Sequence, residues 1–139
     1  MILLDTNVVS ELWKVEPNAN VLRWIDAQAV ETLFLSAITV AELRYGIAVL
    51  PEGRRRTVLH ERLVGEVLPL FAGRVLPFDV DASLAYAGLM SRARASGRAI
   101  GVADGYIAAI ALARRLTVAS RDVSPFAAAG VDVIDPWQP

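Results

Sequence analysis

The sequence predicts a single α/β domain in which helices flank a central, mostly parallel sheet of five strands. Short apolar runs typical of strands alternate with longer segments of helical periodicity along the whole chain. The length of 139 residues suits one domain. Alternation of strands and helices favours a parallel sheet, because each parallel connection needs a crossover. We assign residues 1–135 to this domain and residues 136–139 to a short C-terminal tail.

The first strand is expected at residues 2–4, a run of three apolar residues. Helical patterns follow over residues 6–14 and 18–28, and Pro17 and Asn18 separate the two.

The second strand is expected at residues 32–35, and a helix over residues 40–50 follows it. Pro51 and Gly53 end that helix. Apolar residues then recur at helical spacing over residues 54–72, which predicts a long amphipathic helix.

The last part of the chain repeats the alternation. A third strand is expected at residues 75–78, and a helix over residues 82–96 ends at Gly97. The remaining elements are an alanine-rich helix over residues 104–115, a strand at 117–119, a short helix at 125–129 and a fifth strand at 131–134.

The composition of the chain limits the kinds of covalent cross-link and metal site that it can form. The chain has no cysteine and a single histidine, His60, which excludes disulfides and multi-histidine metal sites. Any metal must therefore be bound mainly by oxygen, which favours Mg²⁺, Mn²⁺ or Ca²⁺. The net charge of −1 is lower than that of many nucleic-acid binders. The sequence shows neither a signal peptide nor an apolar run of eighteen residues, so we expect a cytoplasmic protein without a membrane partner.

Four carboxylates stand where a parallel sheet gathers its ligands, outside the carboxyl ends of the strands. Asp5 follows the first strand, Glu42 lies shortly after the second, and Asp122 follows the fourth. Asp104 opens the alanine-rich helix that leads into the fourth strand. Because clustered carboxylates repel one another, we expect a hard divalent cation to bind between them.

Each acid taken singly also has a structural interpretation. Asp5, Asp104 and Asp122 have the positions of helix caps or turn residues. Thr39 and Glu42 have the T-x-x-E spacing of a capping box. The set as a whole favours the metal site.

Four segments resemble the sequence motifs of PIN-domain proteins, most closely the bacterial VapC/FitB-like toxins, over nearly the whole length. The segments are Leu3-Leu4-Asp5-Thr6-Asn7; Ser36-Ala37-Ile38-Thr39-Val40-Ala41-Glu42-Leu43 followed by Gly46; Ala103-Asp104 followed by Ile107-Ala108-Ala109; and Thr117-Val118-Ala119-Ser120-Arg121-Asp122 followed by Phe126. One such motif is weak, whereas four in the family's order and spacing are specific.

The resemblance implies a Mg²⁺- or Mn²⁺-dependent ribonuclease, the toxin of a type II toxin–antitoxin pair, which forms a homodimer and binds a cognate antitoxin. It assigns metal binding and catalysis to Asp5, Glu42 and Asp104. The fourth motif departs from the commoner form, which has Asn at the position of Asp122 and Asp at that of Pro125. Since Pro125 has no carboxylate, we expect Asp122 to supply the fourth.

In the expected mechanism, water attacks an RNA phosphodiester and leaves a 5′-phosphate. Thr6, Asn7 and Ser120 are expected to position ligand, water or phosphate, and Arg121 to contact the RNA backbone beside the acids. Other basic candidates for that contact are Arg54, Arg55, Arg56, Arg62, Arg92, Arg94 and Arg98, and for most of these we favour a solvated helix face over RNA contact. For Trp13, Trp24 and Trp137 we favour core or interface packing over base stacking.

Three other functions remain open at this point. The same acids suit a DNA-acting PIN nuclease, and a non-catalytic RNA- or metal-binding module is a second alternative. A nucleotide-binding α/β protein is the third, and neither G-x-G-x-x-G nor G-x-x-x-x-G-K-[ST] follows a strand to support it.

Overall fold

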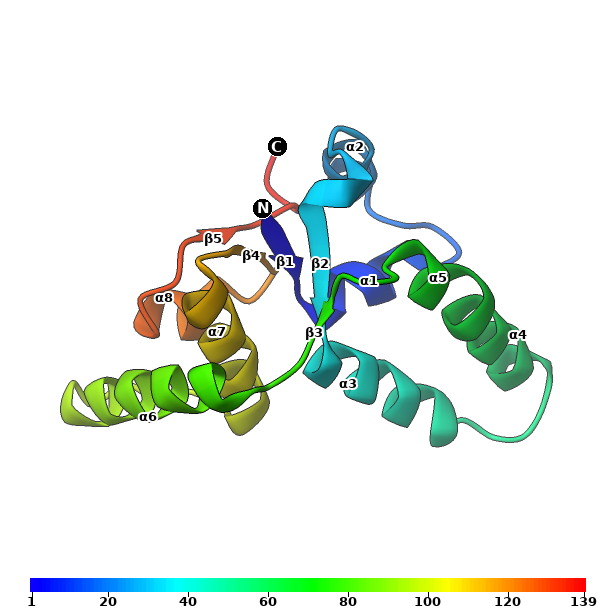
Figure 1. The fold of residues 1–139 in the computed structure, drawn as a ribbon. Helices are drawn as coiled ribbons and strands as arrows, with labels where there is room; N and C mark the ends of the chain where they lie inside the picture. The colour runs from blue at the N-terminus through cyan, green and yellow to red at the C-terminus, as the bar shows by residue number, and fades with distance from the viewer.

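A five-stranded sheet forms the centre of the computed structural model, which describes residues 1–139 (Figure 1). The strands are β1 (Ile2–Leu4), β2 (Leu33–Ser36), β3 (Val75–Leu76), β4 (Thr117–Ala119) and β5 (Val133–Ile134). Their order is β3-β2-β1-β4-β5, and every neighbouring pair is parallel. The expected α/β class and five-stranded parallel sheet are therefore confirmed.

Helices cover both faces of this sheet. Figure 1 shows α6 (Val80–Ala95), α7 (Val102–Arg114) and α8 (Val123–Ala128) on one side, and α1 (Thr6–Leu12), α4 (Arg54–Arg62) and α5 (Leu68–Leu70) on the other. The remaining helices are α2 (Ala19–Asp26), α3 (Ala37–Ala48) and a short 3₁₀ turn at Val30–Thr32. None of the helices is both long and apolar enough to cross a membrane.

Two hydrophobic cores follow from the alternation of side chains along the strands. Leu3 and Val118 belong to the core under α6, α7 and α8, whereas Leu4 and Ala119 belong to the core under α1, α2 and α3. Successive strand residues point to opposite faces, so a sheet covered on both sides needs consecutive apolar residues. This explains why the strands read as unbroken apolar runs.

Several helix boundaries differ from the expected ones because capping side chains set them. Ser36 caps α3 by accepting a 3.0 Å hydrogen bond from the Thr39 backbone N–H, so this helix begins at Ala37 rather than at residue 40. The capping-box interpretation of Thr39 and Glu42 was therefore wrong. Asp79 caps α6 in the same way, through a 2.9 Å bond from the Ala82 N–H.

The expected helix over residues 54–72 is continuous but irregular. A π-helical turn at Leu63–Val67 lies between α4 and α5. Pro69, at the start of α5, has no N–H to continue the regular ladder, and a wider turn just before it accommodates that loss.

Other ends moved by one to three residues. The first two helices stop at Leu12 and Asp26, β3 ends before Pro77, and β5 is shortened to Val133–Ile134. α7 starts at Val102, which places Asp104 inside its first turn.

The C-terminal residues pack against the domain. The Trp137 carbonyl accepts a 2.8 Å hydrogen bond from the Asn20 side chain, and the Arg121 guanidinium lies 5.5 Å from the centre of the Trp137 ring. Trp13, Trp24 and Trp137 all contact the core under α1, α2 and α3, so the expectation of packing is confirmed for these residues.

Candidate active site

A polar cavity of about 380 Å³ opens at the carboxyl ends of β1 and β4. The residues that line it are Asp5, Thr6, Asn7, Ser10, Glu42, Asp104 and Asp122, none of which is apolar. All four acids singled out from the sequence thus face one cavity, together with Thr6 and Asn7.

Asp5 is the buried member of this group, with only 5% of its surface exposed. It directly follows β1, and its backbone N–H continues the sheet by donating to the Ala119 carbonyl at 2.9 Å. Its Oδ1 accepts a 2.8 Å hydrogen bond from the Thr6 N–H, which makes Asp5 the N-cap of α1. The capping and the site interpretations of this residue are therefore compatible.

Ser120 holds the other oxygen of Asp5. Its hydroxyl donates to Asp5 Oδ2 at 2.8 Å and accepts from the Asn7 amide at 3.2 Å and from the Asp122 N–H at 3.0 Å. Ser120 is fully buried and does not line the cavity. Its contact to the site is therefore through Asp5 and Asn7.

Glu42 is held from the opposite side by Thr6. The Thr6 hydroxyl donates to Glu42 Oε1 at 2.7 Å, and the buried Thr39 hydroxyl lies 3.2 Å from that of Thr6. Thr6 thereby links the end of β1 to the first turns of α3 and fixes the rotamer of an otherwise exposed glutamate.

Asp104 and Asp122 come to the cavity from α7 and from the N-terminus of α8. Neither side chain makes a capping hydrogen bond, so the capping interpretation does not explain them. Their carboxylates face the cavity without a partner from the protein.

The electrostatics of the site show that negative charge is crowded there. Burial raises the pKa of Asp5 to about 6, and the charges of Asp104 and Glu42 add to this rise. Burial also raises the pKa of Asp104, with contributions from the charges of Asp122 and Glu42. A bound cation would reverse both effects, because it stabilises the charged carboxylates.

The donor set fits a hard divalent cation. Every lining side chain offers oxygen, and neither sulfur nor imidazole is present. No three of the carboxylates yet converge tightly enough to form a finished ligand set. Glu42, Asp104 and Asp122 line the same cavity as Asp5 and are less buried than it is.

Arg121 lies beside the site but outside the cavity lining. Its backbone N–H donates to Asn7 Oδ1 at 3.3 Å, while its guanidinium lies over Trp137. Ser10 is the lining residue that the sequence did not indicate. It follows Asn7 by three residues on α1, so helical spacing from a recognised motif is the signal that finds it.

Comparison with known proteins identifies a matching family and similar proteins that span the whole chain. The model of the PIN domain family matches residues 2–131. The chain is 66% identical over 139 residues to VapC ribonuclease Y4jK of Sinorhizobium fredii, and the alignment covers 100% of this chain and 99% of that protein. It is 54% identical over 137 residues to Toxin FitB of Neisseria gonorrhoeae, with 99% of each chain covered.

Solved structures show that the similarity extends to the fold. The crystal structure of FitAcB from Neisseria gonorrhoeae superimposes with a TM-score of 0.97 at 53% identity and covers 100% of both chains. A structure of FitAB bound to an IR36 DNA fragment matches with the same TM-score at 51% identity.

Proposed function

This chain belongs to the PIN domain family, and on that basis we propose that it is the toxin of a toxin–antitoxin pair that hydrolyses RNA phosphodiesters with a bound Mg²⁺ or Mn²⁺ ion. The similarity to a VapC ribonuclease and to Toxin FitB over the whole chain supports the nuclease and toxin assignments. The observation that carries the chemistry is the polar cavity in which the buried Asp5 faces three further carboxylates.

Asp5 and Asp104 would be the main ligands of the ion. Thr6 holds one oxygen of Asp5 and Ser120 holds the other, so both oxygens are oriented before any ligand binds. Asp122 would complete the acidic set from α8. When bound, such an ion would polarise a phosphate and favour deprotonation of a water molecule.

Glu42 has a different part in the proposal. Its Oε1 accepts a hydrogen bond from the Thr6 hydroxyl at 2.7 Å, and its other oxygen has no hydrogen bond within the protein. In that position Glu42 orients the attacking water or accepts its proton. Asn7 and Ser120 maintain the geometry by holding Asp5 between β1 and β4.

The proposal includes a partner, because a free ribonuclease would damage its own cell. The matching complex of FitAB with a DNA fragment supports an antitoxin partner for this chain as well. We expect a homodimer in complex with that antitoxin, acting on RNA in the cytoplasm.

Cleavage of a labelled, structured RNA tests this proposal. The chain is purified with its partner, separated from it, refolded and incubated with Mg²⁺, Mn²⁺ or EDTA, with a DNA of the same sequence in parallel. Asp5→Asn should abolish cleavage, while Asp81→Asn, an exposed acid on α6, should behave as the wild type.

The products and the substrate preference decide between mechanisms. Water attack leaves a 5′-phosphate and a 3′-hydroxyl, whereas a 2′,3′-cyclic phosphate would mean that the ribose hydroxyl attacked. Cleavage of DNA alone would contradict the RNA assignment. Folded protein that cuts neither strand with any metal would favour a non-catalytic binding module.

A further inference from the structure

A second cavity adjoins the acidic one and lies between α1, α3 and α4. It has a volume of about 210 Å³ and shares Thr6, Ser10 and Glu42 with the acidic cavity. We call it the flanking cavity. Whatever fills it lies directly beside Glu42, at the edge of the acidic cavity.

Two cations line the flanking cavity, whereas carboxylates line the adjoining acidic cavity. The cations are Lys14, two residues after the end of α1, and Arg55 in the first turn of α4. A nucleic acid that passes through the acidic site needs cations to hold its phosphates on either side. The two cations of the flanking cavity, next to the carboxylates of the acidic cavity, form such an arrangement.

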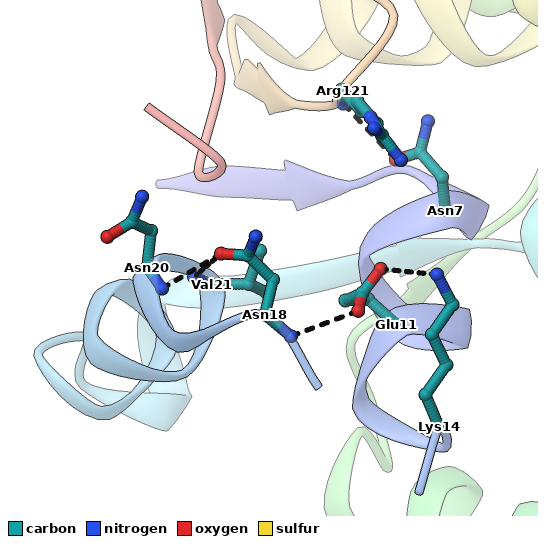
Figure 2. Close-up of polar contacts among 7 residues, drawn as sticks. All are labelled: Asn7, Glu11, Lys14, Asn18, Asn20, Val21 and Arg121. Carbon is teal, nitrogen blue, oxygen red and sulfur yellow. Dashed lines mark hydrogen bonds and ion pairs between the residues drawn. The ribbon is translucent and has the colours of Figure 1, made fainter. Parts of the chain in front are cut away.

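Lys14 is held in place by a buried carboxylate. Figure 2 shows Glu11 on α1 accepting a 2.9 Å hydrogen bond from the Lys14 ammonium and a 3.0 Å bond from the Asn18 N–H. Glu11 is 4% exposed, whereas 58% of the Lys14 side chain is exposed. Because an ammonium group has three N–H donors, Lys14 keeps donors for an incoming phosphate.

Gly46 leaves this cavity open. It lies inside α3 and lines the flanking cavity, and a Cβ at this position would meet no atom within 4 Å. Glycine inside a helix costs about 1 kcal/mol relative to alanine. Neither packing nor backbone conformation requires glycine here, and the missing side chain leaves the surface of α3 bare at the cavity wall.

The rest of the wall is apolar and suits a base or sugar. It consists of Trp13, Leu43, Ile47, Leu50 and Leu59. The volume is below the roughly 300–1,000 Å³ of pockets for drug-sized ligands. The cavity therefore has room for a base or a sugar, with the phosphate at its open edge, rather than for a folded segment.

We propose that the flanking cavity binds the nucleotide next to the cleaved phosphodiester, with Lys14 and Arg55 on its phosphate and the Gly46 face of α3 against its base or sugar. This inference rests on the proposed RNA substrate. It makes Lys14, Gly46 and Arg55 determinants of how the strand is held, in addition to the four acids.

Binding of a fluorescein-labelled RNA hexamer, measured by fluorescence anisotropy in EDTA so that no strand is cut, tests the inference. Gly46→Phe places a large side chain at the cavity wall from a position where a Cβ meets no atom, and Arg55→Ala removes an exposed cation. Arg55→Ala should weaken binding about tenfold, the loss expected for one charged contact. Gly46→Phe should weaken it by a similar factor of about ten, because its ring takes the space of the nucleotide. For Arg55→Ala the dependence of log Kd on log salt should also fall by about 0.7, the value for one phosphate of a single strand.

Matched controls are Gly65→Phe, at a glycine outside both cavities whose Cβ would also meet nothing, and Arg23→Ala, an exposed arginine on α2 that lines neither cavity. Both should bind RNA as the wild type does. Wild-type affinity in Gly46→Phe and Arg55→Ala, or no hexamer binding by the wild type, would overturn the inference.

Two further results distinguish this inference from binding of the partner protein and from the proposed catalysis. If Gly46→Phe no longer co-purified with the partner protein but still bound RNA, the partner and not RNA would occupy the cavity. That result would overturn the inference. Hexamer binding that depends on Gly46 and Arg55 in a protein that never cuts RNA would support the cavity and contradict only the proposed catalysis.

Discussion

Ser120 donates a hydrogen bond of 2.8 Å to Asp5 Oδ2, and this contact joins residues 115 positions apart in the sequence. It is short because β1 and β4 are neighbours in register, with Leu4 beside Ala119. The next residue of each strand, Asp5 and Ser120, must then lie side by side at the edge of the sheet. The strand pairing thus builds the buried part of the acidic site.

Ser120→Ala removes a hydrogen bond that lowers the pKa of Asp5, so this pKa should rise further above its value of about 6. We expect the acid limb of the pH–rate profile for RNA cleavage to shift to higher pH. The rate at neutral pH should fall about 10–100-fold, as for loss of a residue that orients a metal ligand. Ser124→Ala on the exposed side of α8 is the control, and an identical profile in both variants would refute the role of Ser120.

Asp5→Asn should stabilise the metal-free protein at pH 7 while abolishing cleavage. The pKa of Asp5 is raised in the folded state, from 3.8 to about 6. Its contribution to stability is therefore complete below pH 3.8 and is lost as the pH rises through 6. The difference of about two units corresponds to at most about 3 kcal/mol at pH 7.

Urea unfolding in EDTA at several pH values between 5 and 8 measures this effect. The wild type should lose stability over that range relative to Asp5→Asn, and the control Asp26→Asn, an exposed acid in α2, should follow the wild type. A decrease in stability of Asp5→Asn at pH 7 would show that its hydrogen bonds outweigh the desolvation of its charge.

Mg²⁺ or Mn²⁺ should raise the melting temperature of the wild type, because the ion binds the folded acids and relieves their repulsion. At a concentration 100 times Kd, the gain is about 2.7 kcal/mol. Asp104→Asn should lose most of this gain, whereas Asp81→Asn should keep it. Equal gains in the two variants, measured by calorimetry with and without EDTA, would place the ion elsewhere.

Two glycines should respond to substitution in opposite directions. A Cβ at Gly105 would lie 3.0 Å from Met90 Sδ and 3.1 Å from Tyr86 Cε2, so α6 and α7 pack closely there. Gly105→Val should cost about 1–3 kcal/mol by overpacking. Gly46→Ala, with open space around it, should gain about 0.5–1 kcal/mol from helix propensity. Denaturant unfolding of both variants checks the pair, and a loss in Gly46→Ala would contradict its description as open.

Local pattern in the sequence was enough for the fold class and the order of the elements. The apolar strand runs and helical periodicity identified all five strands and the long helices, since both signals come from burial of neighbouring side chains. Helix starts were less accurate at Ala37 and Val80, because Ser36 and Asp79 cap them from positions that the apolar pattern does not mark.

The sequence by itself determined that Asp5, Glu42, Asp104 and Asp122 are candidates, since each stands near the end of an element at a recognisable motif. Only the tertiary structure decided that they face one cavity, because this depends on β1 lying between β2 and β4. It also decided that Asp5 is buried and Glu42 exposed, and that Lys14 and Arg55 line one cavity next to Glu42. Burial and charge crowding arise from residues far apart in the chain, so they have no local signal in the sequence.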